Sequence, residues 1–228
     1  MIPMSLLKEI QHITERTYER YSGINLEDFI IGKKRFVFLS HQSRPHVREL
    51  SDVARVFFRK SGERLYLAIY FSDYVIHNLE ANDPRRGLNE KNIYPFIVFV
   101  EEINHGVHTA MKFLAGETDV HQETFIRDLE LLAKIDSYQV LKFFLAYFNP
   151  SNQLETFDRL WIKHHLFERA NTHYRSTLLS HRYGETNALS EKFTRYLDGM
   201  HPENRLAELR HLRGMSYPAK ASYIRMLP

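Results

Sequence analysis

The strongest constraint on the fold of this chain is a change of pattern near residue 89. Before that point, the apolar-rich runs VARVFFRK and RLYLAIYF flank the turn Ser61-Gly62-Glu63, which predicts a β-hairpin. After it, strand signals disappear and apolar residues recur at the three- and four-residue spacing of helices. The sequence therefore predicts an α+β protein with a small antiparallel sheet and a predominantly helical C-terminal half.

The remaining elements follow from the same periodicities. The first part adds an amphipathic helix over 4–21, a third strand over 35–40 and a short helix ending at Leu79. Because apolar residues are dense around 64–71, we expect the sheet to pack on the helices. Residues 1–228 then form one domain, with an α+β part (1–90) and a helical part (91–228). Helices are predicted over 92–115, 120–148, 153–182, 187–199, 203–213 and 217–226.

Composition and missing motifs narrow the function classes. The chain of 228 residues has no Cys, which excludes disulfides, thiolate zinc sites, iron–sulfur clusters and cysteine nucleophiles. No uninterrupted apolar run reaches 18 residues, so no membrane partner is expected, and no secretory signal is recognisable, so we expect a cytoplasmic protein. Glycine-rich nucleotide motifs, H-E-x-x-H and G-x-S-x-G are also missing. Catalytic residues, and whether the protein is an enzyme, stay open.

Glu102 and His105 stand three residues apart in the predicted helix 92–115, almost opposite its apolar stripe. A Glu-x-x-His pair is the spacing used by carboxylate-bridged di-iron bundles, because positions i and i+3 share one helix face. A solvated helix face explains the same spacing, and both interpretations stay open.

Asp136 falls inside the apolar stripe of the predicted helix 120–148, beside Ile135 and Val140. A carboxylate in such surroundings must be neutralised, paired or bound to a metal, since burying it alone is costly. Asp136 therefore either pairs with a polar side chain in a structural role or binds a metal ion.

The predicted helix 153–182 carries four consecutive polar side chains along a heptad seam, starting at His164. They form either a buried polar ladder or a boundary row that touches water. If the seam meets the polar groups of the two preceding helices, the cluster suits Fe, Mn or Zn. The alternative is an ion-paired core in which Arg175 satisfies Asp136 or Glu168. The metal ligands would be Glu102, His105, Asp136, His164 and Glu168, and the accompanying polar cluster Glu130, Asn171 and Arg175.

Basic residues concentrate in two stretches that also contain aromatic residues, although the formal net charge is only +3. Such stretches indicate either a nucleic-acid-binding face or a solvated basic surface balanced by acidic residues elsewhere. The first stretch comprises Lys33, Lys34, Arg35, Arg44, Arg48, Arg55, Arg59 and Lys60, and the second Arg205, Arg210, Arg213, Lys220 and Arg225.

The segments VEEINHGV, RDLELLAKIDSY and LWIKHHLFERANTHYR resemble a family of bacterial proteins. That family has a Glu-x-x-Ser-His segment followed by a Leu/Glu-rich segment ending in Val-Asp-Lys-Phe. The resemblance covers about residues 35–225, and this chain departs from the pattern with Asn104 in place of Ser and with Leu132 and Lys134 in place of Gln and Glu. It implies no activity, only that its matched positions matter. These are Glu102, His105, Glu130 and Asp136.

Together these observations predict an interaction or regulatory protein whose polar helix cluster is structural and whose partner is another protein. One alternative is a metal-binding helical protein, an oxidoreductase or a hydrolase, that uses the His, Glu and Asp ligands above. The other is a basic nucleic-acid-binding module.

Overall fold

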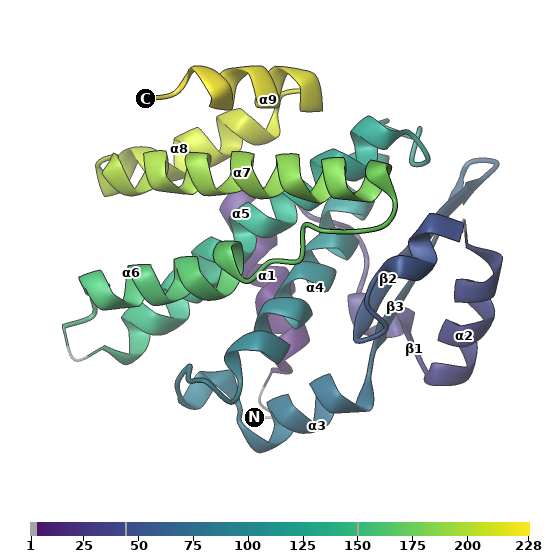
Figure 1. The fold of residues 1–228 in the computed structure, drawn as a ribbon, viewed down its shortest axis with the longest axis horizontal. Helices are drawn as coiled ribbons and strands as arrows, with labels where there is room; N and C mark the ends of the chain where they lie inside the picture. Colours follow the sequence, from purple (N-terminus) through teal and green to yellow (C-terminus); the bar gives the residue numbers. More distant parts are fainter. Residues whose placement is uncertain (1–3, 44, 150) are drawn as a thin grey trace.

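A computed structural model describes residues 4–43, 45–149 and 151–228 and places a three-stranded sheet beside a larger group of helices (Figure 1). The α+β class with a mostly helical C-terminal half is confirmed. The elements are α1 (Leu6–Tyr18), β1 (Ile30–Ile31), α2 (Lys33–Gln42), β2 (Ala54–Ser61), β3 (Arg64–Phe71), α3 (Asp73–Ala81), α4 (Ile93–Leu114), α5 (Glu123–Phe148), α6 (Thr156–Lys163), α7 (Thr177–Gly199), α8 (Pro202–Arg213) and α9 (Tyr217–Met226), with short 3-10 turns at Leu26–Phe29, Pro45–Glu49 and Pro84–Arg86 and a π-helical turn at His164–Glu168.

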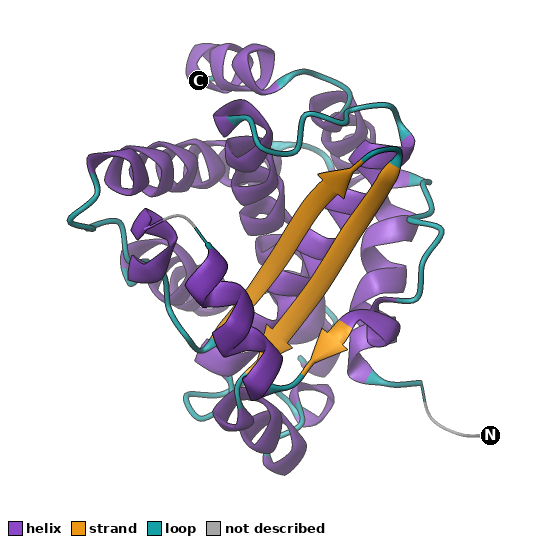
Figure 2. Cartoon of the chain, turned by 90° about the vertical axis from the view of Figure 1, so that its right-hand side faces the viewer, coloured by secondary structure: helices purple, strands orange, loops and turns teal. Residues whose placement is uncertain are grey.

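The predicted hairpin is confirmed: β2 and β3 pair antiparallel from Ala54 opposite Phe71 to Ser61 opposite Arg64. Gly62 begins the two-residue turn with a φ of 59°, a left-handed conformation that glycine adopts without strain. Figure 2 shows the sheet almost face-on with helices behind it. The sheet is mixed rather than wholly antiparallel, because the short strand β1 pairs in parallel with β3.

The strand predicted over 35–40 is wrong, since these residues lie in the helix α2. Their β-rich composition is overridden by burial: Phe36 alone on this helix is buried, and its ring stacks on Tyr70 of β3 at 4.1 Å between centroids. In a helix Phe38 is turned about 200° from Phe36 and is left exposed.

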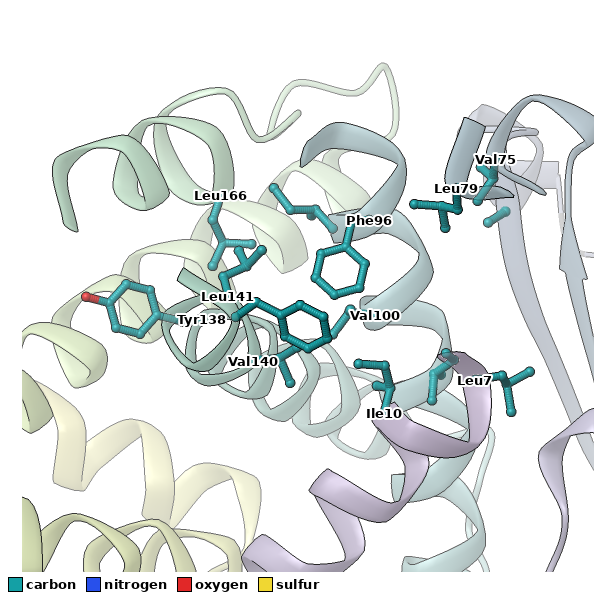
Figure 3. Packing of buried hydrophobic residues seen from close by; sticks show 14 of the residues in the cluster. Leu7, Ile10, Val75, Leu79, Phe96, Val100, Tyr138, Val140, Leu141 and Leu166 are labelled. Carbon is teal, nitrogen blue, oxygen red and sulfur yellow. The ribbon is translucent and has the colours of Figure 1, made fainter. Parts of the chain in front are cut away.

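The inner face of the sheet packs against α4, as expected from the apolar density of β3. Gly106 of α4 permits this approach: a Cβ atom there would lie 3.1 Å from Ile69 Cδ1 and 3.2 Å from Leu26 Cδ2. The same core continues through Phe96 and Val100 of α4 to α1, α3, α5 and the π-helical turn (Figure 3). One apolar cluster therefore joins the sheet to the helices.

The long helix predicted over 153–182 is wrong. The chain leaves helical geometry after Glu168 and starts the helix α7 only at Thr177, and this helix runs through Gly184, where a break was expected. Bonds from outside the segment explain the interruption, because a Glu49 carboxylate accepts the backbone N–H groups of Arg175 and Ser176 at 2.8 and 3.2 Å. The heptad seam therefore ends at the π-helical turn.

No helix among the described residues is both long enough and apolar enough to cross a membrane.

Candidate functional site

His105 of α4 lies between two carboxylates. Its Nδ1 atom is 3.5 Å from Glu102 Oε2, and its Nε2 atom is 3.3 Å from Glu130 Oε2 of α5. Tyr183 of α7 donates its hydroxyl to the other oxygen of Glu130 at 3.0 Å. The three side chains of His105, Glu102 and Glu130 are only 14–17% exposed. Three helices thus contribute to one half-buried polar cluster, which we call the His105 cluster.

The two carboxylates keep His105 protonated. Burial by itself would lower the pKa of this imidazole, but the charge of Glu130 and the contacts with both carboxylates hold the pKa well above its ordinary value. Burial would in turn raise the pKa of Glu130, and the imidazolium together with the Tyr183 hydroxyl lowers it instead. At neutral pH the cluster is an imidazolium paired with carboxylates.

The geometry of the His105 cluster does not resemble a ligand sphere. The two nitrogens of an imidazole point in different directions, so a metal on one of them reaches the carboxylate on that side only. Within residues 4–43, 45–149 and 151–228, no group of three His, Asp or Glu side chains is arranged to hold a metal ion.

Asp136 belongs to a second, sealed cluster. The Tyr18 hydroxyl of α1 donates to its Oδ1 at 2.5 Å, and His108 Nε2 of α4 lies 2.6 Å from its Oδ2. All three residues are buried. Burial lowers the pKa of His108 despite the nearby Asp136 charge, and burial together with Asp136 raises the pKa of Tyr18 well above its ordinary range. The partners of Asp136 are therefore a phenol and a neutral imidazole, not Arg175.

The four polar residues of the supposed seam lie outside both clusters. His164 Nδ1 contacts Glu168 Oε2 at 3.0 Å, with side chains that are 54% and 62% exposed. Asn171 and Arg175 are exposed in the segment between the π-helical turn and α7. These groups are therefore at the surface, two in the π-helical turn and two in the segment after it, and they meet neither His105 nor Asp136.

A third buried cluster was missed by the sequence reasoning. Asp128 of α5 accepts from Lys112 at 2.7 Å and from Lys220 of α9 at 2.6 and 2.8 Å, and all three residues are at most 5% exposed. Burial lowers the pKa of Lys220, and Asp128 opposes that effect. A signal was present, because Lys220 shares the i, i+3, i+4, i+7 spacing of the buried residues Tyr217, Ala221 and Ile224.

The cations of the C-terminal basic stretch make contacts within the protein. Arg210 pairs with Glu19 at 3.0 Å, Lys220 with Asp128, and Arg225 with Glu185. The Arg205 guanidinium donates to the backbone carbonyls of residues 198 and 200, and that of Arg213 lies over the Tyr18 ring. Each of these cations therefore already has an interaction partner within the chain.

The first basic stretch behaves differently. Arg55 is buried and donates to the carbonyls of Leu50 and Ser51, and Arg44 lies outside the described residues. In the part of the chain that the structure describes, six cations of α2 and the hairpin have no carboxylate oxygen within 4.0 Å. They are Lys33, Lys34, Arg35, Arg59, Lys60 and Arg64.

Two aromatic side chains stand among these cations. Phe38 is 59% exposed on α2, and Tyr66 is 48% exposed on β3 with the Arg59 guanidinium 5.7 Å from its ring centroid. Figure 1 shows α2 and the hairpin together on one side of the molecule. We call these two aromatic residues and the six unpaired cations the α2–hairpin surface, in which strand alternation points Lys60 to the opposite face of the hairpin from Arg59 and Tyr66.

An open groove of about 420 Å³ adjoins this surface at the hairpin turn. Lys60 and Gly62 line one side, and residues 118–122 of the α4–α5 connection line the other. The groove contains both His121 and Asp119, so its charge is mixed.

A scan against protein-family models gives no match, and searches of curated proteins and of solved structures give none either. The function of this protein must therefore be inferred from its own structure and charge distribution.

Proposed function

We propose that this protein is an interaction protein without chemistry of its own, and that it binds nucleic acid through the α2–hairpin surface. The observation that carries the proposal is the set of six cations with no carboxylate partner among the described residues. Elsewhere several groups able to do chemistry are held in pairs, such as His105 with Glu130 and Asp128 with Lys220. An array of free cations is what a chain of phosphates requires.

The distribution of charge supports the same partner. Residues 33–66 contain nine of the 31 Lys and Arg residues and only three of the 28 Asp and Glu residues. This stretch therefore has a formal charge of +6, whereas the rest of the chain has −3. A one-sided basic field raises the local concentration of a polyanion and orients its approach. A cytoplasmic location, where nucleic acid is accessible, is part of the proposal.

The test is a binding titration with fluorescently labelled 20-nucleotide DNA, as a single strand and as a duplex, between 50 and 200 mM salt. The triple variant Lys33→Gln, Lys34→Gln and Arg35→Gln removes three cations, and glutamine retains the helix propensity of α2. Because each phosphate contact contributes about 0.7–0.9 to the slope of log affinity against log salt, the slope should fall by about 2–3.

A matched control changes Arg20, Lys91 and Arg195 to Gln, since these exposed cations lie outside the α2–hairpin surface. It removes the same charge and should leave the slope within about 0.5 of the wild-type value. Absence of binding at 50 mM salt would refute the proposed function. Equal losses in the two triple variants would show attraction by net charge only and would refute the site.

A further inference from the structure

We infer that the α2–hairpin surface takes single-stranded nucleic acid, with Phe38 and Tyr66 as stacking platforms for unpaired bases; this inference rests on the proposed function. The first platform is on α2. Since Phe36 faces the sheet, Phe38 faces away from it and is 59% exposed. Helical spacing surrounds the exposed ring with Lys34 one turn before it and His41 one turn after it.

The exposed ring of Phe38 offers an apolar surface that a partner outside the chain can cover. Lys34 and Arg35, one turn before it, are cations, so the surface is poorly suited to an apolar protein interface, whose centre is depleted of charge. A nucleotide satisfies both requirements, because its base offers an apolar face and its phosphate an anion. The composition around Phe38 therefore favours a nucleotide chain.

Tyr66 provides the second platform on the outer face of the hairpin. It stands directly opposite Arg59 across the strands, and the guanidinium lies 5.7 Å from the ring centroid. The Tyr66 hydroxyl has no hydrogen-bond partner among the residues that the structure describes. Arginine and tyrosine planes on an exposed sheet face are surfaces on which single-stranded bases stack.

The preference for a single strand over a duplex follows from the parts of each nucleic acid that are accessible to the protein. A duplex presents phosphates but buries its base faces against each other, so Phe38 and Tyr66 would gain nothing from it. A single strand exposes both phosphates and base faces. The two aromatic rings thus predict a preference for single-stranded over double-stranded nucleic acid, which the six cations alone would not produce.

The experiment compares three probes in which every strand carries a 5′-phosphate, so that the number of phosphates is the same: a 20-nucleotide oligothymidylate, an abasic strand of equal length, and a mixed-sequence duplex of 10 base pairs. The Phe38→Ala, Tyr66→Ala variant should lose about 100-fold in affinity for oligothymidylate, about tenfold for each ring, and less than twofold for the abasic strand. Phe38→Tyr and Tyr66→Phe should restore binding of oligothymidylate, because they retain the rings.

The matched control removes two other exposed rings through Tyr74→Ala and Phe157→Ala and should bind oligothymidylate like the wild type. Equal affinity for all three probes, unchanged in Phe38→Ala, Tyr66→Ala, would overturn the inference while the proposed function stands. Absence of binding to every probe would overturn both. Binding to vesicles containing 30% phosphatidylserine, lost in Phe38→Ala and unaccompanied by oligothymidylate binding, would replace nucleic acid with a membrane surface.

Discussion

Asp128→Asn should be among the most destabilising single substitutions in this protein. Asp128 is 1% exposed and neutralises two buried lysines, Lys112 and Lys220. After the substitution Lys112 keeps Glu117, but Lys220 has no other carboxylate partner among the described residues. Removing one member of a buried pair leaves an uncompensated charge, at a cost of about 3–5 kcal/mol in the free energy of unfolding.

Urea unfolding followed by circular dichroism measures this cost. With a slope of about 2–3 kcal/mol per molar urea, the midpoint should fall by about 1–2.5 M. Glu117→Gln is the matched control: its side chain is 54% exposed, so less than about 1 kcal/mol should be lost.

Two further measurements test the cause of the effect. Adding Lys220→Met to Asp128→Asn should recover at least about 2 kcal/mol, because the buried charge is then gone. In Asp128→Asn alone, Lys220 has a lower pKa in the folded than in the unfolded chain, so stability should rise with pH as this lysine loses its proton. A loss of less than about 1 kcal/mol, or no rescue by Lys220→Met, would refute the reasoning.

Three other outcomes are expected. At pH 7, ¹⁵N-correlated imidazole spectra should show His105 protonated and His108 neutral, because their pKa values are shifted in opposite directions; the reverse assignment would contradict the description of both clusters. The pKa of His105 is raised in the folded protein, so the stability that its protonated form contributes is complete below about pH 6.5 and declines as the pH rises further. The difference in unfolding free energy between wild type and His105→Gln should therefore shrink above about pH 6.5. A constant difference up to about pH 9.5 would contradict the raised pKa. Gly106→Val should cost about 1–3 kcal/mol in thermal or urea unfolding, since a Cβ there already crowds Ile69 and Leu26, and an unchanged midpoint would show that α4 can move away from the sheet.

Local patterns were sufficient where local forces decide the structure. The hairpin follows from alternation and a glycine turn, and the helices α4, α5, α8 and α9 begin and end within a few residues of their predicted limits. The strand predicted over 35–40 was wrong because its strand-like composition was outweighed by tertiary contacts, among them the stacking of Phe36 on Tyr70 and its edge contact with Phe57.

In the candidate site, too, local patterns predict some features, whereas contacts between distant parts of the chain decide others. Asp136 is buried, as its place in an apolar stripe indicates, yet its partner Tyr18 lies 118 residues away and periodicity does not specify which helix faces meet. His164 lies at the surface in the π-helical turn, which is one of the two placements that the sequence left open. The non-helical segment that follows this turn is bound by Glu49, more than 120 residues earlier in the chain. Pairings at such separations arise from the assembled fold, so a pattern along one helix does not contain them.

The two carboxylates on α5 have an implication for synthesis on the ribosome. Asp136 finds Tyr18 in chain made before it, whereas Asp128 needs Lys220, which is translated 92 residues later. A nascent chain in which α5 has left the ribosome but α9 has not therefore lacks Lys220, one of the two lysines that pair with Asp128. Protection of this aspartate from solvent should mature late during translation, after the contact of Tyr18 with Asp136, about two turns further along the same helix, has become available.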